Sequence, residues 1–223
     1  MLEMRGMIES CSIVGREIIF IYKMGLQDFS GNIKPYINDK KKFIHIHIPK
    51  TGGTSLSSMV RTTGGHCRLN DMIKVGVDIS KYYKFTMVRN PFSRLVSFYH
   101  GSGIQKKDGV YWVKFLSKYK NFEHFVLECL PTYEHGSGMT HIEPQTDWIT
   151  NEEGVISMDY IGRFERFDES CREILNKVGI GVNIAHLNGS KHGDYRNYYN
   201  DKMIDVMNTF YDTDLSNFGY KYE

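Results

Sequence analysis

The eight residues from Ile48 to Ser55 constrain the fold of this chain more than any other segment. They read Ile-Pro-Lys-Thr-Gly-Gly-Thr-Ser, follow the apolar run 43–48, and precede Leu56, Met59 and Val60 at helical spacing. This order predicts a buried strand, a loop and a helix. Adjacent glycines let successive backbone N–H groups converge, and the helix N-terminus behind them adds donors and partial positive charge. The segment is typical of a site for a phosphate oxyanion.

The lysine of this loop lies on the wrong side of the glycines for a Walker A loop. In that motif the lysine follows the last glycine and adjoins a Ser or Thr that binds magnesium. Here Lys50 precedes Gly52 and Gly53, and no acidic partner for a metal is evident at a strand end. We therefore expect a ligand other than ATP and no metal. The alternative interpretation is an ordinary Gly-Gly turn with a solvated lysine.

A second segment, from Val88 to Tyr99, repeats the layout of strand, turn and helix. Arg89 ends the predicted strand 84–88, and open α/β sheets bind ligands at the carboxyl ends of their strands. A guanidinium can grip a phosphate through two hydrogen bonds, and Ser97 of the following helix could face the same end. Two such anion sites fit a nucleotide with phosphates at both ends of its ribose. Arg94 is interpreted as a structural residue.

The remaining chain continues to alternate between strand and helix patterns. The predicted elements are a helix from Asn121 to Leu130, a strand over 155–164, a helix capped by Asp168 and ending at Gly179, and a last helix from Asn200 or Asp201. This alternation predicts a single α/β domain over residues 43–223, with a mostly parallel sheet covered on both faces. Residues 1–42 are expected to form a poorly defined N-terminal extension, an appended strand or loop.

Composition narrows the class of protein. The chain has 223 residues, 41% of them hydrophobic and 24% charged, as in an ordinary globular protein. A net charge of +2 without a basic stripe argues against a nucleic-acid partner. No apolar stretch reaches the ~20 residues that span a bilayer, and the four scattered cysteines suit a reducing compartment, so we expect a cytoplasmic protein. Oligomeric state leaves no signal in the sequence.

The two phosphate segments together resemble those of the sulfotransferases that use 3′-phosphoadenosine-5′-phosphosulfate (PAPS). The resemblance is to the carbohydrate type, which includes heparan sulfate 2-O-sulfotransferase and bacterial relatives, and it covers residues 43–223. Segment 48–55 resembles the family's 5′-phosphosulfate loop, 88–99 its 3′-phosphate motif, and 160–165 and 214–220 are also similar. The resemblance implies a P-loop-like three-layer α/β/α fold. It also implies PAPS as donor, adenosine 3′,5′-bisphosphate as product, no metal, and a hydroxyl acceptor of the glycan or glycolipid class.

The resemblance also assigns roles to the two segments. Lys50 would neutralise the charge that develops on the bridging oxygen during an in-line displacement. Arg89 and Ser97 would bind the 3′-phosphate. The residues that would hold the 5′-phosphate are Lys50, Thr51, Gly52, Gly53, Thr54 and Ser55.

The acceptor hydroxyl needs a base near neutral pH, and histidine is the usual choice. Two of the nine histidines are candidates. His66 lies between the two phosphate motifs, where relatives of this type carry their base. His141 lies in a segment that resembles the family's acceptor-side loop. His45 and His47 alternate on the first strand and are interpreted as packing residues rather than metal ligands.

The segment after His141 carries the expected acceptor contacts. Gln145 would suit sugar hydroxyls and Trp148 a sugar face, with a polar loop anchored by one tryptophan as the alternative. Lys191 and Arg196 are candidates to close over the nucleotide, with solvated charges as the alternative. Two other functions stay open: a P-loop-type small-molecule kinase, and a non-catalytic nucleotide-binding module.

Overall fold

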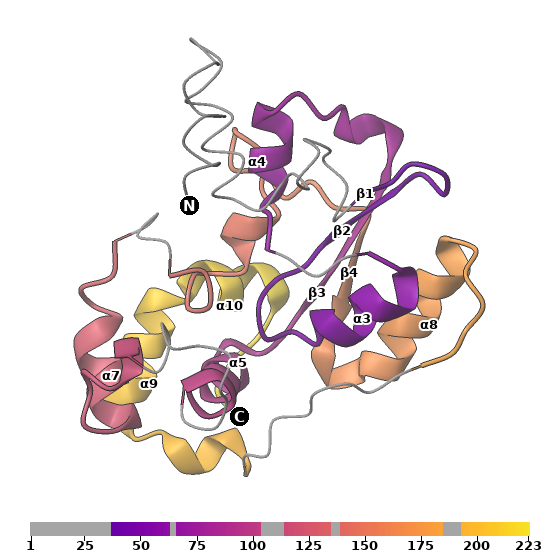
Figure 1. Ribbon diagram of the computed structural model, residues 1–223. Helices are drawn as coiled ribbons and strands as arrows, with labels where there is room; N and C mark the ends of the chain where they lie inside the picture. Colours follow the sequence, from indigo (N-terminus) through magenta and orange to yellow (C-terminus); the bar gives the residue numbers. More distant parts are fainter. Residues whose placement is uncertain (1–36, 63–65, 104–113, 135–138, 185–192) are drawn as a thin grey trace, which may run out of the picture.

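A four-stranded sheet with strand order β1-β2-β3-β4 forms the centre of the protein. The computed structural model describes residues 37–62, 66–103, 114–134, 139–184 and 193–223. The strands are β1 (Ile37–Asn38), β2 (Phe43–Ile46), β3 (Tyr83–Val88) and β4 (Tyr160–Arg163). The last three run parallel, and β1 pairs antiparallel with β2. The predicted mixed α/β fold with a mostly parallel sheet is confirmed (Figure 1).

Helices cover both faces of this sheet because successive strand residues point to opposite sides. On one face, Phe43 and Phe85 pack against α3 (Gly53–Val60) and α8 (Phe167–Lys177), which lie side by side in Figure 1. On the other face, the buried set contains Ile44, Ile46 and Val88 of the strands, Leu69 and Met72 of α4 (Leu69–Lys74), Trp148 of η3 (Thr146–Trp148), and Phe218 of α10 (Asp212–Phe218). Both phosphate segments therefore begin at strands that are buried on two sides.

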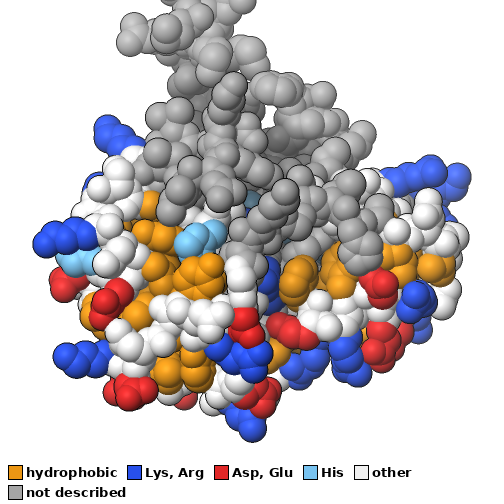
Figure 2. All heavy atoms as spheres, turned by 90° about the horizontal axis from the view of Figure 1, so that it is seen from below, with side chains coloured by type: hydrophobic (Ala, Val, Ile, Leu, Met, Phe, Trp, Pro, Cys, Tyr) orange, Lys and Arg blue, Asp and Glu red, His pale blue; other side chains and the backbone are white. Residues whose placement is uncertain are grey.

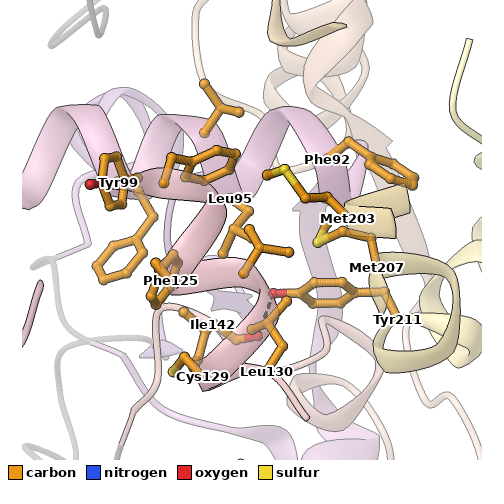
Figure 3. Close-up of a cluster of buried hydrophobic side chains, with 14 of the residues drawn as sticks. Phe92, Leu95, Tyr99, Phe125, Cys129, Leu130, Ile142, Met203, Met207 and Tyr211 are labelled. Atoms are coloured by element: carbon orange, nitrogen blue, oxygen red, sulfur yellow. Dashed lines mark hydrogen bonds between the residues drawn. The ribbon is translucent and has the colours of Figure 1, made fainter. Parts of the chain in front are cut away.

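A third buried cluster fixes the helix that follows β3. This helix, α5 (Pro91–Phe98), packs with α7 (Phe122–Cys129) and α9 (Asp201–Phe210). Figure 3 shows Met203 and Met207 of α9 facing Leu95 of α5. The remaining short elements are the helical turns η1 (Ile79–Lys81), η2 (Tyr99–Gly103), η4 (Phe164–Arg166) and η5 (Tyr195–Tyr198). This packing fixes the position of α5 directly after the end of β3.

Several predicted boundaries differ from the structure. The strand predicted over 155–164 is only Tyr160–Arg163, because the chain before it forms a loop with a single bridge between Thr150 and Ile156. Asp168 does not cap α8: the turn η4 leads straight into that helix, so Asp168 lies in its first turn. The helix also ends at Lys177, before Gly179.

Other helix signals hold. Asn121 caps α7 and Asn200 caps α9, each by accepting a backbone N–H with its side chain. α9 is not the last helix, however, because α10 follows it directly at Tyr211. β1 lies inside the segment expected to be an N-terminal extension. Within the described ranges, no helix has the length and apolar character needed to cross a membrane.

Candidate functional site

The loop between β2 and α3 has the backbone of an anion cradle. Lys50 and Gly52 both have left-handed φ angles, 70° and 81°, which is uncommon for a lysine. A Cβ atom on Gly52 would lie 2.7 Å from the Phe167 ring, and one on Gly53 only 1.9 Å from the His47 ring. Both glycines are therefore required by the rings that press on the loop from the core side. The rings occupy the space that a side chain would need at both positions, and glycine also permits the left-handed φ at position 52.

The hydroxyl groups of this loop have different environments. Thr51 is buried and donates its hydroxyl hydrogen to the carbonyl oxygen of Ile48, at 2.9 Å. Ser55 is buried within α3, whereas Thr54 is exposed at the first turn and Lys50 is half-buried. Thr51 thus shapes the loop itself, while Lys50 and Thr54 reach solvent.

Arg89 lies beside this loop at the end of β3. Its Nη1 donates to the carbonyl oxygen of Lys50 at 3.3 Å, and its Nε and Nη2 donate to the Ser93 hydroxyl at 3.0 and 2.8 Å. The guanidinium also lies 4.2 Å from the centre of the Phe164 ring. Burial lowers the pKa of Arg89 to about 10, which still leaves it charged at neutral pH. The hydrogen-bond partners of this buried cation are neutral, and the nearby Glu165 carboxylate offsets part of the effect of burial on its pKa.

Ser93 is a residue that the sequence reasoning missed. It lies four positions before Ser97, so the two serines share one face of α5. Ser97 is buried on this helix. The signal was available, because Arg89, Ser93 and Ser97 recur at a spacing of four.

Gln145 and Trp148, predicted to contact an acceptor, are both buried. The Gln145 side chain accepts the N–H of Arg89 and donates to the Arg89 carbonyl, both at 2.8 Å. It also donates to the buried carboxylate of Asp214 at 3.2 Å, and Asp214 accepts the Thr146 N–H at 2.8 Å. Gln145 therefore ties the end of β3 to α10 and positions the backbone of Arg89.

The two candidate base histidines lie next to each other. The ring centroids of His66 and His141 are 5.3 Å apart, and those of His47 and His66 are 4.7 Å apart. Burial lowers the pKa of all three, and the Lys50 charge contributes at His66 and His141. The pKa of His141 falls to about 2. All three imidazoles are therefore neutral at pH 7, and the His47 ring lies against Gly53 at the start of α3.

One hydrogen bond defines the protonation of His66. Its Nδ1 lies 3.1 Å from the carbonyl oxygen of His47. A carbonyl oxygen only accepts, so in neutral His66 the proton is on Nδ1 and the lone pair on Nε2. The Nδ1 of His141 lies 3.2 Å from the Thr140 hydroxyl, which can donate or accept and so leaves that tautomer open.

Two further arginines lie near these histidines. Arg94 is buried, and its Nε and Nη1 donate to the carbonyl oxygens of Pro49 and Glu143, as a structural role requires. Arg68 forms an ion pair with the buried carboxylate of Glu143 at 2.5 Å, a contact that nothing in the sequence pattern indicated. Arg94 thus joins the loop between β2 and α3 to the segment that follows His141, and Arg68 binds the same segment from the start of α4.

Of the two residues predicted to close over the nucleotide, the structure describes one. Lys191 falls outside the described residues. Arg196 forms an ion pair with Asp194 at the surface. Figure 2 shows acidic and basic side chains interspersed on the face that it displays. Among the residues that the structure describes, no group of three His, Cys, Asp or Glu side chains could hold a metal ion.

Comparison with known proteins identifies the family of this chain. The model of the sulfotransferase family matches residues 35–221, a range that spans both phosphate segments and all three clustered histidines. A search of curated proteins found no match.

Proposed function

The chain belongs to the sulfotransferase family, and on that premise we propose that it transfers a sulfuryl group from PAPS to a hydroxyl group, specifically of a carbohydrate. The observation that carries the proposal is the 3.3 Å contact between Arg89 Nη1 and the Lys50 carbonyl oxygen. It brings the two anion-binding segments to one edge of the sheet. The parallel strand, the glycine loop and the helix N-terminus also support a P-loop-like three-layer fold.

The residues present suit a donor with two phosphate groups. The backbone N–H groups of Gly52 and Gly53 at the N-terminus of α3, with the Thr54 hydroxyl, would bind the 5′-phosphate. The charged, buried fork of Arg89 would bind the 3′-phosphate together with Ser97. Thr51 and Ser55 would keep these groups in place from within the protein.

Lys50 is the proposed electrostatic catalyst. PAPS supplies a sulfuryl group bonded to a phosphate oxygen that leaves with negative charge. An ammonium group beside that oxygen stabilises the charge as it develops, which needs no metal ion. The half-buried position of Lys50, at the mouth of the loop, is suited to this contact.

His66 is the proposed base. Its Nδ1–H is held by the His47 carbonyl, so Nε2 is the atom that would accept the proton of the acceptor hydroxyl. Base strength favours His66 over His141, because a pKa of about 2 leaves His141 little affinity for a proton. We assign His141 to the wall of the site beside His66.

The acceptor is proposed to be a glycan or glycolipid hydroxyl. Gln145 and Trp148 are both buried, so we do not assign them direct contacts with the acceptor. Their proposed role is to position the elements around the site. Three buried free cysteines, Cys67, Cys129 and Cys171, suit the reducing environment of the cytoplasm. We propose one domain that takes in β1 and extends to the end of the chain, with the preceding residues as an extension.

Calorimetric titration with adenosine 3′,5′-bisphosphate, with and without magnesium and with ATP as competitor, tests the donor. We expect metal-independent binding at about micromolar affinity that ATP does not displace. Release of the bisphosphate from PAPS in a mixture of methyl glycosides then tests transfer. Magnesium-dependent preference for ATP would instead support the kinase, which the family match does not favour. Tight bisphosphate binding without turnover with any acceptor would support a non-catalytic module.

A further inference from the structure

Arg94 connects two segments that the proposed reaction must hold together. It is 1% exposed, and its Nε donates to the Pro49 carbonyl oxygen at 3.0 Å. Its Nη1 donates to the Glu143 carbonyl oxygen at 2.8 Å. Pro49 directly precedes Lys50, and Glu143 follows two residues after His141. One planar side chain therefore spans the loop between β2 and α3, which is the proposed donor loop, and the histidine segment, residues 141–143.

The hydrogen bond from Arg94 to the Pro49 carbonyl helps to hold the backbone conformation of Lys50. A non-glycine residue at a φ of 70° is held there only by its surroundings. The carbonyl on one side of Lys50 accepts from Arg94, and its own carbonyl accepts from Arg89. Two guanidinium groups thus clamp the backbone on both sides of the proposed catalytic lysine. The direction of the Lys50 side chain depends on both.

The third nitrogen of Arg94 adds to this picture. Nη2 is buried and has no hydrogen-bond partner among the residues that the structure describes. In a planar guanidinium Nη2 shares an edge with Nε, which here is the edge that meets the donor loop. The two acceptors of Arg94 are neutral carbonyls, and its charge reaches His66 and His141.

We propose that Arg94 is a positioning residue for sulfuryl transfer, which locks Lys50 and the histidine segment in one arrangement and keeps a positive charge beside His66. The inference rests on the proposed function. A residue with only a structural role would affect the rate through the stability of the protein. The proposed role of Arg94 instead requires a change in the reaction rate and in the His66 pKa that a change in stability does not explain.

The test compares Arg94→Lys and Arg94→Met with a matched control, Arg163→Lys. Arg163 lies at the end of β4, donates to the Phe218 carbonyl at 2.6 Å and stacks on Tyr220, so it also anchors a backbone carbonyl. Calorimetry measures the Kd of adenosine 3′,5′-bisphosphate. The reaction rate is the rate at which this bisphosphate is released from PAPS with methyl glycosides as acceptors, and thermal unfolding measures stability. The pKa of His66 is measured by NMR with labelled histidine.

Arg94→Lys should bind the bisphosphate within about threefold of wild type but release it from PAPS about 100-fold more slowly, because a small misplacement of reacting groups suffices for such a loss. Arg94→Met should in addition raise the pKa of His66. Among the residues that the structure describes, the charged and titratable groups that face His66 are His47, His141, Lys50 and Arg94, and the substitution changes only Arg94. If Arg94→Met does not fold, Arg94→Gln takes its place. Arg163→Lys should leave both the rate and this pKa unchanged.

A wild-type rate for Arg94→Lys would overturn the inference, as would an unchanged His66 pKa in the neutral variant. A loss of rate that follows thermal stability equally in Arg94→Lys and Arg163→Lys would reduce Arg94 to a structural residue. Failure of the wild-type protein to bind the bisphosphate would instead overturn the proposed function, and the inference with it.

Discussion

His66 and His141, which lie far apart in the sequence, face each other with ring centroids 5.3 Å apart. Both were candidates for the base that takes the acceptor proton. Because they are close, loss of either should disturb the same site, so the size of the drop in activity has to be read together with its pH dependence. The protonation of each ring, rather than its position, separates the two roles.

Replacement of each histidine by asparagine should distinguish them. His66→Asn should lower kcat by about 100- to 10,000-fold, the usual contribution of a general base, whereas His141→Asn should lower it less than about tenfold. With wild-type protein, activity should fall as the pH drops through the pKa of His66, which burial holds below its ordinary 6.5. The pH profile of kcat/KM checks this. If His141→Asn were the more damaging change and abolished the acid limb, the assignment would be reversed.

Replacement of Lys50 should mainly reduce turnover, whereas replacement of Arg89 should mainly weaken nucleotide binding. Lys50→Ala should reduce turnover of PAPS by at least about 100-fold, because it removes the charge beside the leaving oxygen, yet keep the affinity for adenosine 3′,5′-bisphosphate. Arg89→Ala should weaken that affinity by about 10- to 100-fold, as expected for lost charged hydrogen bonds. Calorimetry and product release on both variants check the division. A Lys50→Ala protein with wild-type turnover would contradict the mechanism.

Local chemistry explains what could be predicted from the sequence. The glycine pair, the proline after Asn90 and the helical spacing of apolar residues specify the two strand–loop–helix units without reference to the rest of the chain. The roles of Gln145 and Arg94 could not be predicted in this way. Both depend on contacts with segments distant in the sequence, Gln145 with Asp214 and Arg94 with Pro49. A polar residue in a loop has the same pattern whether it faces a ligand or the core.

The contact between Gly53 and His47 can be tested as a pair. Gly53→Ala would place a Cβ atom 1.9 Å from the His47 ring, so we expect a loss of about 1–3 kcal/mol in the free energy of unfolding. His47→Ala in the same chain opens space and should recover part of that loss. Urea denaturation of the single and double variants checks the coupling. Gly181→Ala, with nothing within 4 Å of the added atom, is the control. Strictly additive losses would show that the two residues do not press on each other.

Acid should destabilise the protein through its buried histidines. Burial lowers the pKa of His45 from 6.5 to about 3, so between these values the unfolded chain binds a proton that the folded chain does not. The free energy of unfolding therefore falls as the pH drops below 6.5, with a slope of about 1.4 kcal/mol per pH unit for each such histidine. His45→Gln should reduce this slope by the contribution of one histidine, about 1.4 kcal/mol per pH unit. Urea denaturation at several pH values between about pH 7 and about pH 5 measures it. An unchanged slope would mean that other groups cause the acid sensitivity.

Replacement of Gln145 can distinguish a structural role from a role in binding the acceptor, because the two roles predict different measured effects. Its side chain pairs with both backbone polar groups of Arg89 and also donates to buried Asp214, so Gln145→Leu removes the side-chain partner of the Arg89 N–H and carbonyl, whereas Asp214 keeps its bonds to Thr146. We expect the free energy of unfolding to fall by about 3 kcal/mol and the affinity for adenosine 3′,5′-bisphosphate to weaken, because Arg89 loses its support. Urea denaturation and calorimetry measure the two effects. Unchanged stability and nucleotide affinity with a raised KM for a sugar acceptor would contradict this structural role and show that Gln145 contacts the acceptor.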